Sequence, residues 1–332
     1  MNTIILKPSR KNNHLEVHFN LWNSDSNNLH FLDIGIMCDN EEQEFFLKIP
    51  ASKKITVENL SNEVLDIRNS IFNCFVNIDS DKNGYTVLSK QGDKNDEKFI
   101  LTPEQDTIEL DSKNGGVEHH LKIKKIENNK TNGQYIPLQY LRIRIRNLDI
   151  EKFLIKKQSP SRIFESSYQE NSIIDFRFND YKLLSLKDAQ DLQLQEHKYN
   201  KIHFLYMSDY NENICIASSN YKVRFLEHKI WDDYLGLNTE RKNEMLVYHL
   251  SETEKSNSSF LYKFQKQKTS KSHLLFYAFV VVDLAILANT LFTLFPIKKE
   301  NGNINWLCFV LILVIGVVAP FIIGLLSKIH RK

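Results

Sequence analysis

The sequence has little of what phosphate-binding loops, zinc sites and disulfide scaffolds require. It has 10 glycines among 332 residues. It contains no G-x-x-x-x-G-K, G-x-S-x-G, H-E-x-x-H or dinucleotide-binding glycine motif. Its four cysteines are far apart and never form C-x-x-C, whereas zinc sites and disulfide scaffolds need closer or denser cysteine spacing. We therefore predict no metal site and no cofactor, disfavour an enzyme, and expect reduced core thiols at Cys38, Cys74, Cys215 and Cys308.

The chain also has no excess of one charge and no apolar leader. Its 43 basic and 41 acidic residues give a net charge of +2, without the basic stripe of a nucleic-acid-binding protein. The first residues contain no apolar run long enough for a signal peptide. We expect no nucleic-acid partner, and we expect the large N-terminal part to stay on the side of the membrane where it is made.

Long apolar runs occur only near the C-terminus. Residues 274–295 and 306–326 form two such runs, of 22 and 21 residues. A helix rises ~1.5 Å per residue, so each run is long enough for a hydrocarbon core ~30 Å thick. The short polar connection at residues 296–305 then predicts an antiparallel transmembrane hairpin within residues 273–332.

The basic residues around the two runs predict their orientation. Seven lie on the side of the chain's main part and its C-terminus, and two lie in the connection. The positive-inside rule therefore places both termini in the cytoplasm, and we expect a multi-pass protein of a bacterial inner (plasma) membrane. The seven are Lys263, Lys266, Lys268, Lys271, Lys328, Arg331 and Lys332, and the two are Lys298 and Lys299.

One acidic residue lies near the middle of the first run. A carboxylate at that depth is costly and usually faces protein, which makes Asp283 a candidate functional residue together with Thr290, seven positions later. Pro320 lacks the N–H that would bond the Gly316 carbonyl, so a protonated Asp283 is a candidate donor to it. Gly316, Pro320 and Gly324 form a stripe where another helix can approach. This face is interpreted either as a lock between helices or as the lining of an ion path formed by homo-oligomerisation.

The rest of the chain is dominated by period-two alternation, which is typical of strands. Residues 15–19, 31–37, 44–49, 138–147, 173–178, 201–207 and 221–226 are predicted strands, separated by turn residues. Helical spacing is confined to residues 57–73, 186–196 and 229–235. The predicted class is a mainly β cytosolic domain, sandwich- or barrel-like with a few helices.

We divide the chain into four parts, of which the last, residues 273–332, is the predicted hairpin. Residues 1–157 are a β-rich region, and residues 158–250 are a second β-containing region that either belongs to the same domain or forms its own. Residues 251–272 are polar and rich in lysine, and they are expected to be a linker into the hairpin.

Three arginines alternate with apolar residues in the predicted strand at 138–147. Arg142, Arg144 and Arg146 share one face, which predicts either a solvated outer surface or a site for an anion, since guanidinium groups bind phosphate and carboxylate bidentately. Lys122 and Lys124 would join this site if their strand pairs with that of the arginines.

Residues 79–84 resemble the first half of a calcium-binding loop, with oxygen ligands at alternate positions and a glycine at the sixth. The twelfth position is Lys90 instead of the required glutamate. A turn between strands explains these residues more simply.

The arrangement of a cytosolic β-rich domain and two C-terminal transmembrane helices resembles the membrane-acting effectors of bacterial antiphage defence systems. That architectural resemblance implies a sensor that binds a nucleotide or a protein trigger, and helices that oligomerise to perturb or permeabilise the lipid bilayer. A membrane-anchored scaffold that recruits a protein partner and a membrane-tethered enzyme acting on a lipid or nucleotide are the two alternatives.

Overall fold

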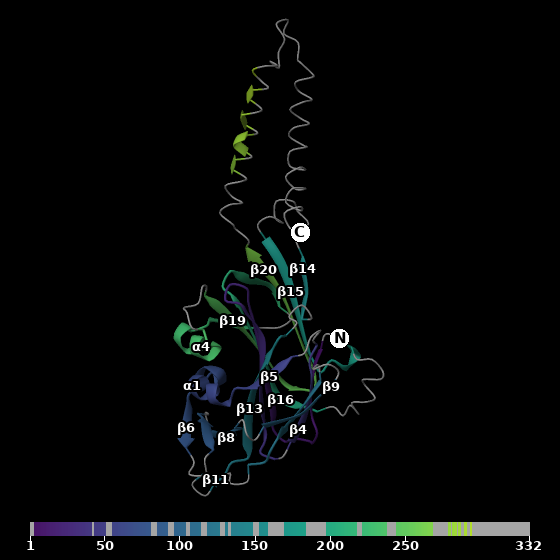
Figure 1. The fold of residues 1–332 in the computed structure, drawn as a ribbon, viewed down its shortest axis with the longest axis vertical. Coiled ribbons are helices and arrows are strands. Elements are labelled where there is room, and N and C mark those ends of the chain that lie inside the picture. The colour runs from purple at the N-terminus through teal and green to yellow at the C-terminus, as the bar shows by residue number, and fades with distance from the viewer. Residues whose placement is uncertain are drawn as a thin grey trace. The chain divides into compact units, whose positions relative to one another are not determined.

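The computed structural model describes most of the first 267 residues. The described ranges are 3–41, 43–50, 55–80, 85–91, 96–103, 107–113, 118–126, 130–131, 134–148, 153–158, 169–183, 197–217, 221–237 and 244–267, with helical positions at 278–279, 281–283, 285–286, 289–290 and 293. Within these ranges the fold is mainly β, as the alternation predicts (Figure 1).

Ten of the described strands form the larger of two main sheets. They are β2 (Leu15–Ser24), β3 (Leu29–Asp39), β5 (Thr56–Asn59), β6 (Val76–Ser80), β7 (Thr86–Lys90), β8 (Glu97–Leu101), β13 (Leu138–Arg146), β16 (Tyr199–Asp209), β18 (Lys222–Phe225) and β19 (Met245–Lys255). Their order is β18-β19-β16-β2-β3-β13-β8-β7-β6, and β5 also pairs with β13. The central pair β16 and β2 is parallel, whereas β2 with β3 and β3 with β13 are antiparallel.

Eight described strands form the smaller main sheet, in the order β17-β20-β15-β1-β4-β10-β9 with β14 beside β15. Two further strands, β11 (Lys130–Thr131) and β12 (Gln134–Tyr135), pair with each other. The eight are β1 (Thr3–Pro8), β4 (Gln43–Lys48), β9 (Thr107–Lys113), β10 (Glu118–Ile123), β14 (Leu154–Gln158), β15 (Gln169–Phe178), β17 (Glu212–Ala217) and β20 (Ser258–Gln267).

The main hydrophobic core combines the inner faces of both sheets, so the domain is a β-sandwich. Alternate apolar residues of β1, β4, β15 and β20 meet those of β2, β3, β13 and β16. At its centre the rings of Phe204 and Phe260 are stacked with centroids 5.1 Å apart, and Phe176 lies 4.3 Å from Phe204. Each such aromatic pair contributes about 0.5–1.5 kcal/mol beyond the area it buries.

Two helices cover the outer face of the larger sheet. Helices α1 (Ser61–Phe72) and α4 (His228–Leu235) contact each other, as Figure 1 shows, and α1 also contacts β13. A second apolar cluster fills the space beneath them, with Trp22 and Phe31 from the sheet and Trp231 and Tyr234 from α4. Strands β2 and β3 are consequently buried on both faces. A short 3₁₀ helix, η3 (Tyr181–Leu183), follows β15.

A glycine in β3 permits this close packing. Gly35 pairs with His18 of β2 and with Arg142 of β13. A Cβ atom at position 35 would clash with the Tyr140 hydroxyl group, so a larger residue there would displace the tyrosine ring.

Within the described residues, the predicted elements agree with the structure except at two places. Helix α1 starts at Ser61 instead of residue 57, because residues 56–59 pair with β13 as β5. Residues 251–255 and 258–267 belong to β19 and β20 instead of the expected linker. In β20, Phe260, Tyr262 and Phe264 occupy alternate positions and face the core, a period-two pattern that the lysine-rich composition conceals. The helix predicted at 186–196 lies outside the described residues.

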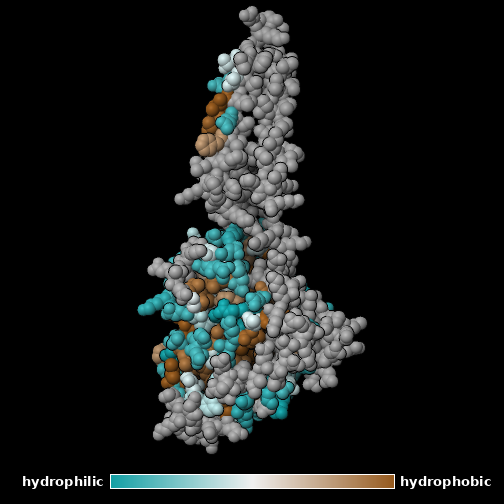
Figure 2. Space-filling model, viewed as in Figure 1, coloured by the Kyte–Doolittle hydropathy of each residue, from teal (hydrophilic) through white to brown (hydrophobic). Residues whose placement is uncertain are grey.

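The chain divides into two compact units. Residues 1–156 and 172–264 form the first, so strands from both sides of the boundary expected near residue 158 share its two sheets. Residues 157–171 and 265–332 form the second. On the face seen in Figure 2, hydrophilic side chains are interspersed with apolar ones over the described surface of the β-rich part.

No helix among the described residues has the length and apolar character needed to cross a membrane. The predicted span at 274–295 falls only partly within those residues, and the one at 306–326 falls entirely outside them.

Candidate functional site

Two of the three predicted anion-binding arginines are buried and bind a carboxylate of the chain itself. Arg142 and Arg144 are 0% and 2% exposed. Arg144 donates from Nε to Oδ1 of Asp33 at 2.7 Å and from Nη2 to Oδ2 at 3.1 Å. Arg142 donates from Nε to the Tyr234 hydroxyl at 2.8 Å, and that hydroxyl donates to Asp33 Oδ2 at 2.7 Å. The arginines do face outward while the alternate isoleucines face the core, but the helices cover this face and Asp33 supplies the anion.

The structure does not bring the five predicted basic residues together. Arg146 is exposed and its Nε lies 2.8 Å from Oε1 of Glu58. Lys122 belongs to β10, which pairs with β4 and β9 in the smaller sheet instead of with β13. Its Nζ lies 3.9 Å from Oε1 of Glu44, and Lys124 follows the end of the same strand. The condition for a shared face, pairing of the two strands, is not met, because the strands belong to different sheets.

The predicted intramembrane residues are described only in part. Asp283 and Thr290 occupy helical positions, and the Thr290 hydroxyl donates to the Ile286 carbonyl one turn earlier, at 2.8 Å. The remaining members of the predicted face lie outside the described residues: Gly316, Pro320 and Gly324.

The other predicted features have structural explanations. The calcium-like segment connects β6 to β7, which pair as antiparallel neighbours up to Ser80 and Thr86. Residues 81–84 themselves lie outside the description. Cys38 is buried in the main core as predicted, whereas Cys74 is half-buried and Cys215 is exposed. Burial raises the pKa of the Cys38 thiol to about 12.

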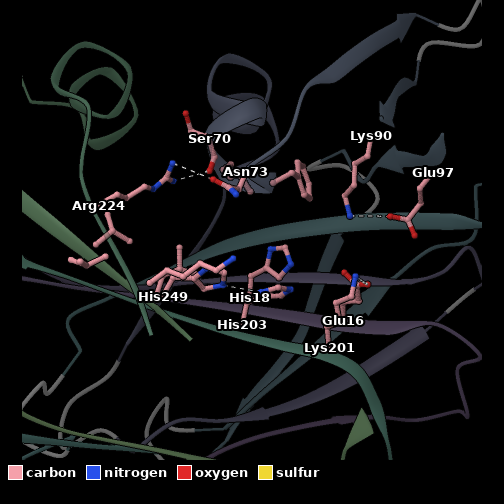
Figure 3. Close-up of a pocket in the computed structure, with 16 residues that line it drawn as sticks. Glu16, His18, Ser70, Asn73, Lys90, Glu97, Lys201, His203, Arg224 and His249 are labelled. Carbon is pink, nitrogen blue, oxygen red and sulfur yellow. Dashed lines mark hydrogen bonds and ion pairs between the residues drawn. The ribbon is translucent and has the colours of Figure 1, made fainter. Parts of the chain in front are cut away.

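A cavity of about 410 Å³ lies on the outer face of the larger sheet, where charged and imidazole side chains from several strands converge (Figure 3). Its floor comes from β2, β16 and β19, and its walls come from the end of α1, from β7 and β8, and from β18. The charged and imidazole side chains that line it are Glu16, His18, Lys90, Glu97, Lys201, His203, Lys222, Arg224 and His249.

Strand register brings the floor residues together. In the parallel pair of β2 and β16, Lys201 is the partner of Glu16, and His203 is the partner of His18. Val17 of β2 and Ile202 of β16 lie between these residues in their strands and face the main core, so period-two geometry directs the polar side chains outward. His249 of β19 is the partner of Leu205, which places it diagonally across from His203.

The three histidines form a row across adjacent strands. The rings of His18 and His203 meet edge to face with centroids 4.7 Å apart, and His203 Nδ1 lies 3.0 Å from His249 Nε2. Burial lowers the pKa of all three imidazoles, to about 4 for His203 and well below the usual value for His18. At neutral pH each ring is therefore uncharged, with one nitrogen that donates and one that accepts.

The glutamate at one end of this row is ionised. Burial alone would raise the pKa of Glu16, but His14 and the positive charges of Lys90 and Lys201 outweigh burial and hold it well below the usual range. Oε1 of Glu16 lies 3.3 Å from His14 Nε2 and 3.4 Å from Lys201 Nζ. Lys90 in turn lies 3.0 Å from Glu97, at the same end of the cavity (Figure 3).

The opposite wall is held by contacts between β18 and α1. Arg224 donates to the Ser70 carbonyl at 3.3 Å and to the side-chain oxygen of Asn73, the C-cap residue after α1, at 3.4 Å. A cation at a helix C-terminus is favourable because the last carbonyl groups there lack helical donors. Arg224 therefore fixes the end of α1, which carries the apolar side chains of Ile71 and Phe72 into the cavity.

The composition of the cavity lining favours binding of an organic anion. Four cationic and two carboxylate side chains line it, an excess of two positive charges when the imidazoles are neutral. Apolar side chains form another part of the wall, namely Ile71, Phe72, Leu205, Val223 and Val247. Small-molecule sites characteristically combine such an apolar surface with a few directed polar groups.

The sequence predictions missed this site. Glu16 and His18 lie on the outward face of a correctly predicted strand, and so does His203, so the alternation alone marks them as neighbours of the core residues. Their meeting depends on the pairing of β2 with β16, whose partnered residues are 185 positions apart. No local pattern in the sequence specifies that pairing.

Comparison of the chain with protein-family models gives no match, and comparison with curated proteins gives none either.

Proposed function

We propose that this chain is a membrane-anchored sensor whose β-sandwich binds a small organic anion in the histidine-lined cavity. The observation that supports the proposal most directly is the excess of positive charge around an apolar-walled cavity of about 410 Å³. A phosphate or carboxylate group would satisfy the charge, and an attached apolar or aromatic group would occupy the apolar wall. A mononucleotide or an aromatic carboxylate has this chemistry.

The residue best suited to bind the anionic group is Lys222. Lys90 and Lys201 already lie beside Glu97 and Glu16, at 3.0 and 3.4 Å. Among the described residues, Lys222 forms no ion pair, and it projects from β18 into the lining of the cavity. A hydrogen bond to a charged group contributes about 1.5–3 kcal/mol to binding, so the loss of the Lys222 contact should lower the affinity measurably.

The site is connected along the chain to the segment expected to enter the membrane. His249 lies in β19, the next strand β20 ends at Gln267, and the first predicted membrane span begins at residue 274. We infer that the ligand acts by changing the position of α1, β18 and β19, and that oligomerisation of the hairpin then perturbs the bilayer. A role in antiphage defence is the setting that the architecture suggests.

A binding assay on the full-length chain, purified in detergent, tests the proposal. The melting temperature would be measured by thermal unfolding, and the binding affinity by isothermal titration calorimetry. The ligands would be mononucleotides, aromatic carboxylates and their uncharged analogues, for example adenosine monophosphate against adenosine. We expect the anions to raise the melting temperature, with an effect that weakens at high salt. Lys222→Ala should weaken binding about tenfold or more.

Lys229→Ala is the matched control, because Lys229 is an exposed lysine of α4 that does not line the cavity. It should bind like the unaltered chain. Binding of the uncharged analogues as tightly as the anions, or equal binding by Lys222→Ala and the control, would contradict the proposal.

Exposed apolar residues near the cavity support a second candidate function, recruitment of a protein partner by a membrane-anchored scaffold. Val223 and Phe225 of β18 are 53% and 63% exposed, and β18 is the outermost strand at its end of the larger sheet. An exposed apolar edge strand is a common template for pairing with another chain.

A further inference from the structure

We propose that Glu16, His18 and His203 form a binding site for a single divalent transition-metal ion, of which zinc is the expected one. One ligand atom from each of the three residues lies within 4.8 Å of the other two. Glu16 and His18 are buried and His203 is half-buried. The proposal concerns the floor of the cavity and does not rest on the anion site assigned to Lys222.

The geometry needs only a small contraction to reach metal coordination. Metal–ligand bonds of about 2.0–2.2 Å in a tetrahedral arrangement place the ligand atoms about 3.4 Å apart. The ligand atoms of the three residues now lie within 4.8 Å of one another. Rotation of the side chains can bring them to the shorter separation. The backbone does not have to move, because the register of β2 and β16 already places His18 directly beside His203.

The chemistry of the three donors points to a particular class of ion. Two imidazoles and one carboxylate suit zinc and its neighbours in the transition series, whereas magnesium and calcium prefer sites made of oxygen ligands. The set provides three protein ligands, which leaves a fourth tetrahedral position directed toward the cavity for water or a ligand.

Neighbouring side chains contact the three ligands and fix their orientation, as groups around the ligands of known metal sites do. His203 Nδ1 is 3.0 Å from His249, which leaves the other ring nitrogen of His203 for the metal. His14 and Lys201 hold the Glu16 carboxylate at 3.3 and 3.4 Å. Such contacts fix ring orientation and carboxylate position, and their loss typically lowers metal affinity about 10–100-fold.

The nearby cations set the limit on affinity. Lys201 is 51% exposed in its side chain, so its ammonium group can turn toward solvent when a metal takes its place beside Glu16. Lys90 already lies 3.0 Å from Glu97, which offsets part of its charge. The remaining repulsion between these ammonium groups and a bound cation weakens the binding of ions that are held mainly by charge. Ions that bind imidazole strongly are therefore favoured.

The test uses the full-length chain purified in detergent, treated with a chelator and then dialysed. Zinc stoichiometry would be measured by elemental analysis and affinity by titration calorimetry, with magnesium and calcium in parallel. Cobalt(II) absorption would report tetrahedral coordination. We expect about one zinc per chain, a tetrahedral cobalt spectrum and no comparable binding of magnesium or calcium.

Three variants remove the ligands one at a time: His18→Ala, His203→Ala and Glu16→Gln. Each should weaken zinc binding at least tenfold. Glu16→Gln preserves the side-chain shape, so it still tests whether zinc binding depends on these ligands if a histidine variant does not fold. His30→Ala is the matched control, because His30 lies outside the cavity beside Asp25 and should bind zinc like the unaltered chain.

Absence of zinc binding by the unaltered chain would overturn the inference. Zinc binding that persists undiminished in Glu16→Gln and in the folded histidine variants would also overturn it. Anion binding measured with the chelator present depends on Lys222 and not on the metal ligands, so failure of either proposal can be distinguished from failure of the other.

Discussion

At the scale of single residues, Asp33 has an unusual position for a charged group. It is fully buried in β3 and accepts hydrogen bonds from Arg144, Tyr234 and Trp22. Arg142 lies 3.7 Å away from the same carboxylate. Two buried guanidinium groups therefore share one buried carboxylate. Removing one partner from such a group is costly because it leaves the remaining charge without compensation in a region that excludes water.

We predict that Asp33→Asn lowers the free energy of unfolding by about 3–5 kcal/mol. The asparagine keeps the shape of the side chain but removes the charge that compensates Arg142 and Arg144. The measurement is thermal and denaturant unfolding of the full-length chain in detergent.

Glu58→Gln is the matched control, since it removes the partner of Arg146 on the solvent-exposed surface. It should cost less than about 1 kcal/mol. Equal effects of the two substitutions would show that the buried network contributes no more than a surface ion pair.

At the scale of elements, the eight-residue helix α4 supplies much of the apolar packing on the outer face of the larger sheet. It carries Trp231 and Tyr234 onto the outer face of the larger sheet, where they pack against Trp22 with centroids 5.6 and 6.4 Å from its ring. The helix ends at Leu235 and is capped by Gly236, which has a left-handed conformation with φ of 66°. The N–H groups of Gly236 and Leu237 bond the carbonyls of Asp233 and Asp232, so the last turn is satisfied internally.

We predict that Gly236→Ala destabilises the domain by about 1 kcal/mol, because a Cβ atom disfavours the left-handed conformation. Among the described residues, no atom outside the adjoining backbone and chain neighbours lies within 4 Å of that Cβ position, so the cost comes from the backbone alone. Thermal unfolding measures it. Gly236→Asn should cost less, since asparagine tolerates this conformation better. A cost for asparagine equal to that for alanine would contradict the explanation.

At the scale of the whole molecule, the β-sandwich is one compact unit whose last strands precede the predicted hairpin. The proposed sensor requires that the hairpin do more than anchor the chain. Asp283 motivates this requirement, because it lies near the middle of the predicted span at 274–295, where a carboxylate is costly and a passive anchor does not need it.

We predict that Asp283→Ala abolishes activity, measured as loss of membrane potential with a dye during controlled expression in bacteria. Asp283→Asn separates the two interpretations of this residue. Asparagine keeps a hydrogen-bond donor, so retained activity would support a lock between helices and exclude a proton- or cation-conducting carboxylate. An intact membrane potential for the unaltered chain with every bound anion would contradict the effector proposal.

Exchange of the hairpin for an unrelated two-helix anchor is the companion control. The sensor proposal expects activity to be lost, because the native helices perturb the bilayer. The scaffold alternative expects function to survive, because any anchor would hold the β-sandwich at the membrane.

Much of the fold follows from local pattern. Residues 138–147 alternate so regularly that β13 and its inward isoleucines are predictable, and Trp231 and its neighbours indicate α4. The candidate site is different. His18 and His203 are single residues in separate strands, and their pairing is a long-range choice among many strands of similar composition. The arginine site was predicted where alternation is most visible, but alternation does not reveal which surface a helix will cover.

The sequence by itself determined the mainly β class, the positions of seven strands and the two long apolar runs, because period, turn residues and run length are local properties. Only the tertiary structure decided that Arg142 and Arg144 meet Asp33 beneath α4. It also decided that Glu16 and His18 meet His203 in an open cavity. The physical reason is that burial and strand pairing depend on neighbours distant in sequence. A polar outward face becomes a buried network where another element covers it. The same kind of face becomes a candidate binding site where it stays open.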